Sequence, residues 1–156
     1  MIEPAQLDPL DRRILRALQR DGAISHAALA EHVGASSASC WRRIRALESA
    51  GVLGASVRLL DPVAIGRPMS ILCHVRMKLH DPASRAAFET FVAGREEVME
   101  CFAMSGEWDY HLRVVAADVS DYERFLMREL LAHPAVLTSA SHFALSRVKY
   151  TTAMPV

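Results

Sequence analysis

Residues 24–51 combine apolar spacings of three and four with an internal glycine, and this pattern is compatible with little besides two short helices. Leu29 and Val33 fall one helical turn apart after Ser25, whose hydroxyl can accept a hydrogen bond from an early backbone N–H. Gly34 predicts the end of this first helix, because glycine adopts the left-handed conformation without steric cost.

The second helix follows this glycine and has two different faces. Ser36 or Ser37 can cap its start, and Gly51 predicts its end. Apolar residues spaced four and three apart form one face: Cys40, Ile44 and Leu47. Three basic residues lie off this stripe: Arg42, Arg43 and Arg45.

A helix with one buried face and several arginines elsewhere suits the major groove of DNA. Hydroxyls and helix-start N–H groups can bind phosphate, and arginine can bind phosphate or guanine. Arginines on an exposed helix are usually only solvated, so the two-helix arrangement carries the inference. The predicted DNA contacts are Ser36, Ser37, Ser39, Arg42, Arg43 and Arg45. Trp41 either contacts DNA as well or packs against the preceding helix.

A third helix precedes these two, over approximately Pro9–Arg20. Apolar residues repeat in it at three or four positions, Asp8 can cap it, and Pro9 suits its first position. Three helices make a DNA-binding domain over residues 1–53. An extended hinge over residues 54–68 follows, with Asp-Pro and Gly-Arg-Pro breaks.

From Ser70 onward the apolar period changes to two, which is typical of a β-strand. The remaining patterns predict the order strand, helix, strand, strand, helix, strand, which is the βαββαβ order of ferredoxin-like domains. The chain is therefore predicted to be α+β, with this domain at residues 69–156. Both helices cover one face of such a sheet, and the mixed apolar and basic residues of the other face favour contact with a second copy.

Composition restricts the partners and the compartment. The 156 residues have no formal net charge, with eight basic against six acidic residues up to position 60 and ten against twelve beyond it. Because the first 60 residues carry only a small excess of basic residues, firm binding to one duplex favours two or more copies of the chain. The odd number of cysteines, three, argues against a disulfide framework, and no membrane span or signal peptide is recognised, so we expect a cytoplasmic protein.

The chain resembles the Lrp/AsnC (leucine-responsive, feast/famine) family of transcription regulators. Four segments carry the resemblance: Leu7–Leu15, Cys40–Val52, the turn Ser105–Tyr110, and Val148–Pro155. The resemblance implies a winged helix-turn-helix joined to a ligand-binding domain that forms homodimers and often octamers and commonly binds amino acids. It also implies that the effector lies near Gly106–Tyr110.

The residues of this turn suit an amino-acid effector, and no cofactor is expected. Gly106 allows close approach to the backbone, Asp109 can pair with an ammonium group, and Trp108 and Tyr110 can supply apolar walls. Ser139 and Ser141 on the last strand are further candidates for polar contacts. The alternative is an ordinary hairpin turn whose aromatic residues pack in a core.

Other functions have weaker support in the sequence. His74, His111 and His142 could meet across neighbouring strands, but no metal-ligand spacing occurs and the adjacent Cys73 and His74 face opposite sides of a strand. No catalytic constellation is recognised, so no enzyme is expected. The prediction is a sequence-specific regulator that binds a roughly palindromic DNA duplex and is modulated by an amino acid or related metabolite. The alternative is a ligand-binding or metal-sensing oligomer without specific DNA binding.

Overall fold

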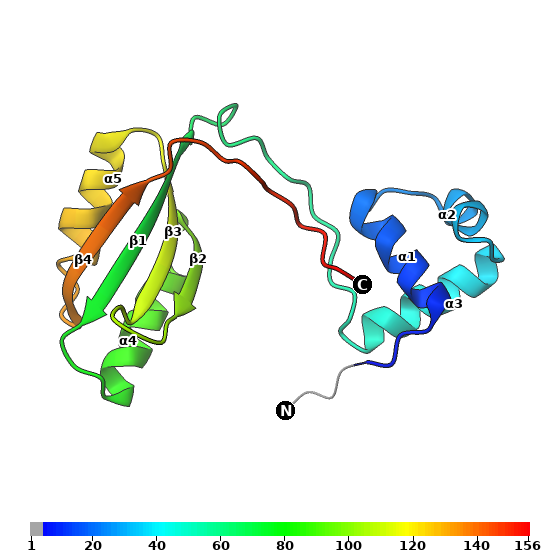
Figure 1. Ribbon diagram of the computed structural model, residues 1–156, viewed down its shortest axis with the longest axis horizontal. Helices are drawn as coiled ribbons and strands as arrows, with labels where there is room; N and C mark the ends of the chain where they lie inside the picture. The colour runs from blue at the N-terminus through cyan, green and yellow to red at the C-terminus, as the bar shows by residue number, and fades with distance from the viewer. Residues whose placement is uncertain (1–4) are drawn as a thin grey trace. The chain divides into compact units, whose positions relative to one another are not determined.

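The computed structural model describes residues 5–156 and divides into two compact units (Figure 1). The helical unit contains the chain up to Leu59 together with residues 149–156, and the sheet unit is Leu60–Val148. The predicted second domain ran to residue 156. The structure instead groups residues 149–156 with the helical unit, because the Gln19 side chain donates to the Met154 carbonyl at 3.1 Å and Val156 packs against the helical core.

The helical unit contains three helices, α1 (Pro9–Arg20), α2 (His26–Val33) and α3 (Ser37–Ser49). The predicted caps are present: Asp8 at α1, Ser25 at α2 and Ser36 at α3. Gly34 ends α2 with a φ of 67°, the left-handed conformation that favours glycine. No strand occurs within residues 5–68, so the hinge predicted at 54–68 is extended chain and turns.

A small apolar core holds the three helices together. It is lined by side chains from all three: Ile14, Leu15, Ala17, Leu29, Ala30, Val33, Cys40 and Leu47. Ile14 of α1 and Leu29 of α2 are fully buried. Each belongs to the apolar stripe that the sequence predicts for its helix. Cys40 and Leu47 give α3 the buried side that its sequence predicts.

The sheet unit has the predicted element order. Its elements are β1 (Met69–Met77), α4 (Pro82–Ala93), β2 (Val98–Ala103), β3 (Tyr110–Ala116), α5 (Val119–Phe125), a following π-helical turn η1 (Leu126–Leu130) and β4 (Val136–Phe143). The antiparallel strands are ordered β2-β3-β1-β4, so the two central strands are β1 and β3. This topology confirms the α+β, ferredoxin-like prediction.

Two boundaries differ from the sequence prediction. The cap of α5 is Asp118, whose carboxylate accepts from the Asp121 N–H at 2.8 Å, rather than Ser120, which lies inside the helix. The last strand ends at Phe143 and not near Tyr150, because the register with β1 stops at the Ile71 pair and the chain then leaves the sheet.

The two faces of the sheet have different chemistry. The inner face carries Cys73, Val75 and Leu112, which are buried beneath Phe88 of α4 and Phe125 of α5. The opposite face, here called the open sheet face, carries Leu72, His74, Arg76, Phe102, His111, Arg113 and His142. Strand alternation therefore separates the core from a mixed surface of apolar and charged side chains, on which Glu100 pairs with Arg113 at 3.0 Å.

None of the helices in residues 5–156 is long and apolar enough to cross a membrane.

Candidate nucleic-acid interface and effector turn

The start of α3 presents a row of serines. Ser36 is exposed, and its Oγ accepts from the Ser39 N–H at 3.2 Å, which satisfies one of the unpaired amides of the first turn. A hydroxyl that accepts one bond keeps its proton for donation. Ser37 is also exposed, whereas Ser39 is half-buried. The cap and the phosphate-binding role predicted for these serines are therefore compatible.

One side of α3 points away from the core of the helical unit. The outer face of α3, as we use the term, consists of the exposed residues Ala38, Trp41, Arg42, Arg45 and Ser49, at spacings of three and four. Arg42 makes no ion pair within residues 5–156, and Arg45 makes a loose one with Glu48 at 3.3 Å while its side chain stays 66% exposed. Both guanidiniums are available to a ligand.

Trp41 lies on this outer face and not in the core. The residue is 52% exposed, and the guanidinium carbon of Arg45 is 5.8 Å from the centroid of its ring. Trp41 is therefore outside the buried core of the helical unit, and its contact with DNA stays a prediction.

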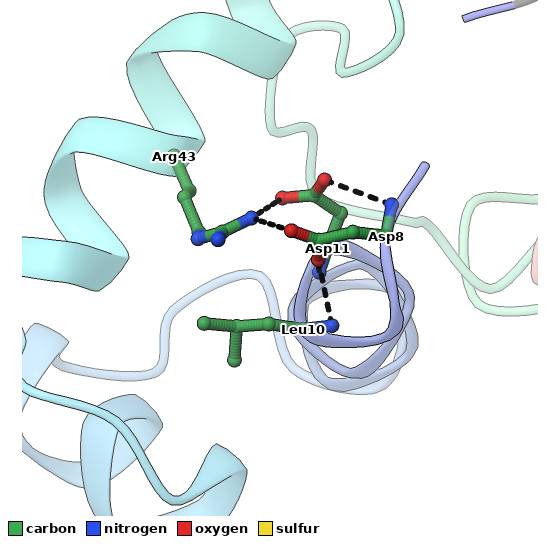
Figure 2. A network of polar contacts seen from close by, with 4 residues as sticks. All are labelled: Asp8, Leu10, Asp11 and Arg43. Carbon is green, nitrogen blue, oxygen red and sulfur yellow. Dashed lines mark hydrogen bonds and ion pairs between the residues drawn. The ribbon is translucent and has the colours of Figure 1, made fainter. Parts of the chain in front are cut away.

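Arg43 has partners within the protein, which the sequence analysis did not foresee. Its Nη1 donates to Asp8 Oδ2 at 2.5 Å and to Asp11 Oδ1 at 2.8 Å, as Figure 2 shows. The same Asp8 caps α1 by accepting from the Leu10 and Asp11 N–H groups at 2.8 and 2.9 Å. Arg43 thus ties α3 to the start of α1, so the structure gives it a role in the packing of the helices.

The ion pairs are reflected in the acidity of the groups. The hydrogen bond to Asp11, followed by that to Asp8, raises the pKa of Arg43. The Asp11 backbone N–H, followed by the Arg43 guanidinium, lowers the pKa of Asp8 below its ordinary value of 3.8. Asp8 is therefore ionised at neutral pH, where it pairs with Arg43.

The predicted effector turn connects β2 to β3. Gly106 has a φ of 116°, where a side chain would be strained, and nothing lies within 4 Å of the position that a Cβ would take. Arg76 holds the turn against β1, since its guanidinium donates to the Glu107 carbonyl at 3.2 Å and to the Glu107 carboxylate at 2.9 Å. The same guanidinium lies over the Trp108 ring at 5.0 Å.

Asp109 closes the turn and is already hydrogen bonded. Its Oδ2 accepts from the Met77 N–H at 2.8 Å, and its Oδ1 lies 3.3 Å from His80 Nδ1. Two carboxylate oxygens offer about four acceptor positions, so room for a further donor remains. The carboxylate is thus held in place by β1 and can still receive an ammonium group.

Tyr110, Ser139 and Ser141 do not gather at this turn. Tyr110 is 4% exposed on the inner face, and its hydroxyl donates to Glu89 at 2.8 Å, while burial raises its pKa to about 12. Ser141 pairs with the Tyr122 hydroxyl at 2.5 Å, and Ser139 lies opposite Val75. Tyr110 lies two residues before Leu112, and Ser139 and Ser141 lie four and two residues before Phe143, so each shares the inner face with these apolar residues. This two-residue period was the signal that could have assigned them to the inner face.

Three histidines meet on the open sheet face. The ring centroid of His74 lies 4.7 Å from that of His111 and 5.4 Å from that of His142. Burial, with the charge of His74 second, lowers the pKa of His111 below 6.5. Cys73 is on the inner face, and residues 5–156 contain no cluster of three His, Cys, Asp or Glu side chains arranged to hold a metal ion.

A hollow of about 330 Å³ lies at the other end of β2 and β3, beside α5. Its rim carries charges of both signs: Arg67, Glu96, Glu97, Asp121, Arg124 and Glu129. Asp121 binds both arginines of this rim, Arg67 at 2.6 Å and Arg124 at 2.8 Å. None of the predicted effector residues lines this hollow.

Two family models match the chain in succession. Residues 7–53 match a winged helix-turn-helix DNA-binding domain, and residues 70–154 match the Lrp/AsnC ligand binding domain. A curated relative, the DNA-binding transcriptional activator DecR of Escherichia coli K12, is 37% identical over 150 residues, which cover 96% of this chain and 99% of that protein.

Solved structures show the same similarity. A transcriptional regulator of Neisseria meningitidis in complex with L-methionine superposes with a TM-score of 0.93 at 33% identity, covering 96% of this chain and 97% of that one. An AsnC family transcriptional regulator of Agrobacterium tumefaciens has a TM-score of 0.91 at 40% identity, with the same coverage of both chains.

Replacing Arg43 by alanine should lower the melting temperature of the helical unit, because Asp8 and Asp11 then face each other without a cation. Circular dichroism at neutral pH measures this, with Arg42→Ala as the matched control that leaves the melting temperature unchanged. The contribution of a carboxyl with a lowered pKa is present above its unfolded value of 3.8 and is lost as the pH falls through the folded value. The difference between Arg43→Ala and wild type should therefore shrink in acid. Equal melting temperatures at pH 7 would contradict the assignment.

Proposed function

Because the chain belongs to the Lrp/AsnC family of transcription regulators, we propose that it is a sequence-specific DNA-binding regulator whose action an amino acid modulates. It works by binding and not by catalysis, with double-stranded DNA in the cytoplasm as its partner. The observation that supports DNA binding best is the outer face of α3, where Arg42 and Arg45 remain exposed beside the serine-rich helix start.

The DNA is held by groups with different tasks. Ser36, Ser37 and the first N–H groups of α3 bind phosphate, which fixes the position of the helix on the duplex. Ser39, only half-buried, adds a hydroxyl at the same end of the helix. Arg42 and Arg45 reach into the major groove, where an arginine can bind guanine through two hydrogen bonds. In this proposal Arg43 does not contact DNA and instead holds α3 against the start of α1.

A second copy of the chain covers the open sheet face. Leu72 is 36% exposed and Phe102 is 52% exposed there, and both lie among histidines and arginines, a mixture typical of an interface. A two-fold dimer presents two copies of α3 about 34 Å apart along the duplex, so the operator is roughly palindromic. The family resemblance supports further assembly of dimers into octamers.

An amino acid binds at the Gly106–Asp109 turn. The L-methionine in the Neisseria structure supports this class of effector. Asp109 receives the ammonium group, the backbone near Gly106 binds the carboxylate, and Trp108 lies beside the side chain of the ligand. Tyr110, Ser139 and Ser141 lie behind this turn and support the sheet. The effector shifts DNA binding only by preferring one state of the assembly.

Arg42→Ala should weaken binding of a duplex selected from a random pool by the full-length protein by about tenfold, through loss of a phosphate or guanine contact. Fluorescence anisotropy over a range of salt concentrations should also show a shallower salt dependence. Arg128→Ala, which removes another exposed arginine, from the sheet unit, is the matched control. Unchanged binding by Arg42→Ala would exclude Arg42 from the interface.

Leu72→Glu should dissociate the dimer, since it places a carboxylate in the middle of the open sheet face. Sedimentation analysis measures the mass in solution. Val119→Glu, at a 59% exposed position on α5, tests the same change of charge away from this face and should keep the assembly of the wild type. A Leu72→Glu protein with the mass of the wild type would place the interface elsewhere.

One or more of the twenty amino acids should raise the melting temperature of the protein. A ligand at a hundred times its Kd stabilises the folded state by about 2.7 kcal/mol. Asp109→Asn keeps an acceptor for the Met77 N–H but loses the charge, so it should abolish the shift, whereas Glu107→Gln should retain it. A full shift in Asp109→Asn would show that the effector binds elsewhere.

A further inference from the structure

Trp41 is the exposed apolar side chain of the DNA-binding helices. Within residues 5–53 it is the one large hydrophobic residue that the structure leaves exposed, at 52%. The core beneath α3 is complete without it, because Cys40 and Leu47 already fill the buried side of the helix. The fold of the helical unit therefore does not explain this residue.

The surroundings of Trp41 restrict what can cover it. It is the fifth residue of α3, with Arg42 next in the chain and the Arg45 guanidinium 5.8 Å from its ring. Ala38, one turn earlier, has a small side chain that leaves the ring accessible from the start of the helix. An apolar protein surface would have to desolvate both arginines, at a substantial cost. A polyanion neutralises them instead.

Duplex DNA offers an apolar group between its phosphates. The C5-methyl group of thymine projects into the major groove, where apolar side chains recognise it. A fully covered aromatic side chain buries about 150–250 Å², and with 52% of its surface exposed Trp41 can offer about half of such an area. Residues in the first half of a recognition helix are those that reach base edges.

We propose that Trp41 contacts a thymine methyl group in each half-site and so makes thymine preferred at one position of the operator. This inference rests on the proposed DNA-binding function and adds a base-specific contact to it. Arg42 and Arg45 bind the neighbouring phosphate or guanine, while Trp41 selects thymine over cytosine, which lacks the methyl group.

Replacement of thymine by uracil tests the proposal, because uracil pairs normally and lacks only the methyl group. The probe is a duplex selected from a random pool by the full-length protein, with each symmetric thymine pair replaced in turn. Wild-type protein should lose affinity several-fold at one pair, since each buried methyl group is worth roughly fourfold in binding. Trp41→Ala should bind the thymine and uracil duplexes equally.

Two controls separate this proposal from the proposed function. Met127→Ala removes a large side chain of similar exposure, 57%, from the sheet unit and should keep the thymine preference. The melting temperature of Trp41→Ala should equal that of the wild type, because the ring is not part of the core, and the uracil comparison on wild-type protein needs no variant.

Two results would overturn the inference. The first is a wild-type protein that binds the thymine and uracil duplexes equally at every position. The second is a thymine preference that survives in Trp41→Ala. This includes the case in which Trp41→Ala loses the same factor of affinity, relative to wild type, on both duplexes, which would indicate stacking on the sugar. If Arg42→Ala weakens binding and these results appear, only the inference about Trp41 fails. If no duplex is enriched, DNA recognition itself fails.

Discussion

The ion-paired contact between Arg43 and the start of α1 determines which side of α3 is left for other molecules. Arg43 donates to Asp8 and Asp11, and Asp8 in turn caps α1, so one guanidinium orients two helices. The buried side of α3 provides the apolar part of the same constraint. With these two sides fixed, the residues of the outer face can point only away from the core, and the proposed DNA contacts depend on this orientation.

In the sheet unit, the two-residue alternation of the strands decides which side chains are buried. Alternation places Val75 and Leu112 under the helices and leaves His74 and His111 on the open face. In the proposed function a second copy covers this open face, and dimerisation would provide the second α3 that a weakly charged chain needs. The turn at Gly106 is held on β1 by Arg76, which connects the proposed effector site to a strand of the proposed interface.

The elements were predictable from the sequence where short-range chemistry decides them. Asp8, Ser25 and Gly34 act within a few residues of their positions, and the start of α1 and both ends of α2 follow from them. The partners of Arg43 lie 35 and 32 residues away, and no local pattern encodes such a distance. The burial of Tyr110 could have been inferred from the sequence, because it lies two residues before the apolar Leu112 and so shares its face of the strand. The resemblance to an effector turn instead favoured a ligand contact for Tyr110.

A crystal structure of the full-length protein with its selected duplex tests the central claim most directly. The account predicts that the outer face of α3 lies in the major groove with Arg42 against DNA, while Arg43 keeps its contacts with Asp8 and Asp11. A complex in which the outer face of α3 points away from the duplex, or in which Arg43 leaves these carboxylates to bind DNA, would contradict it.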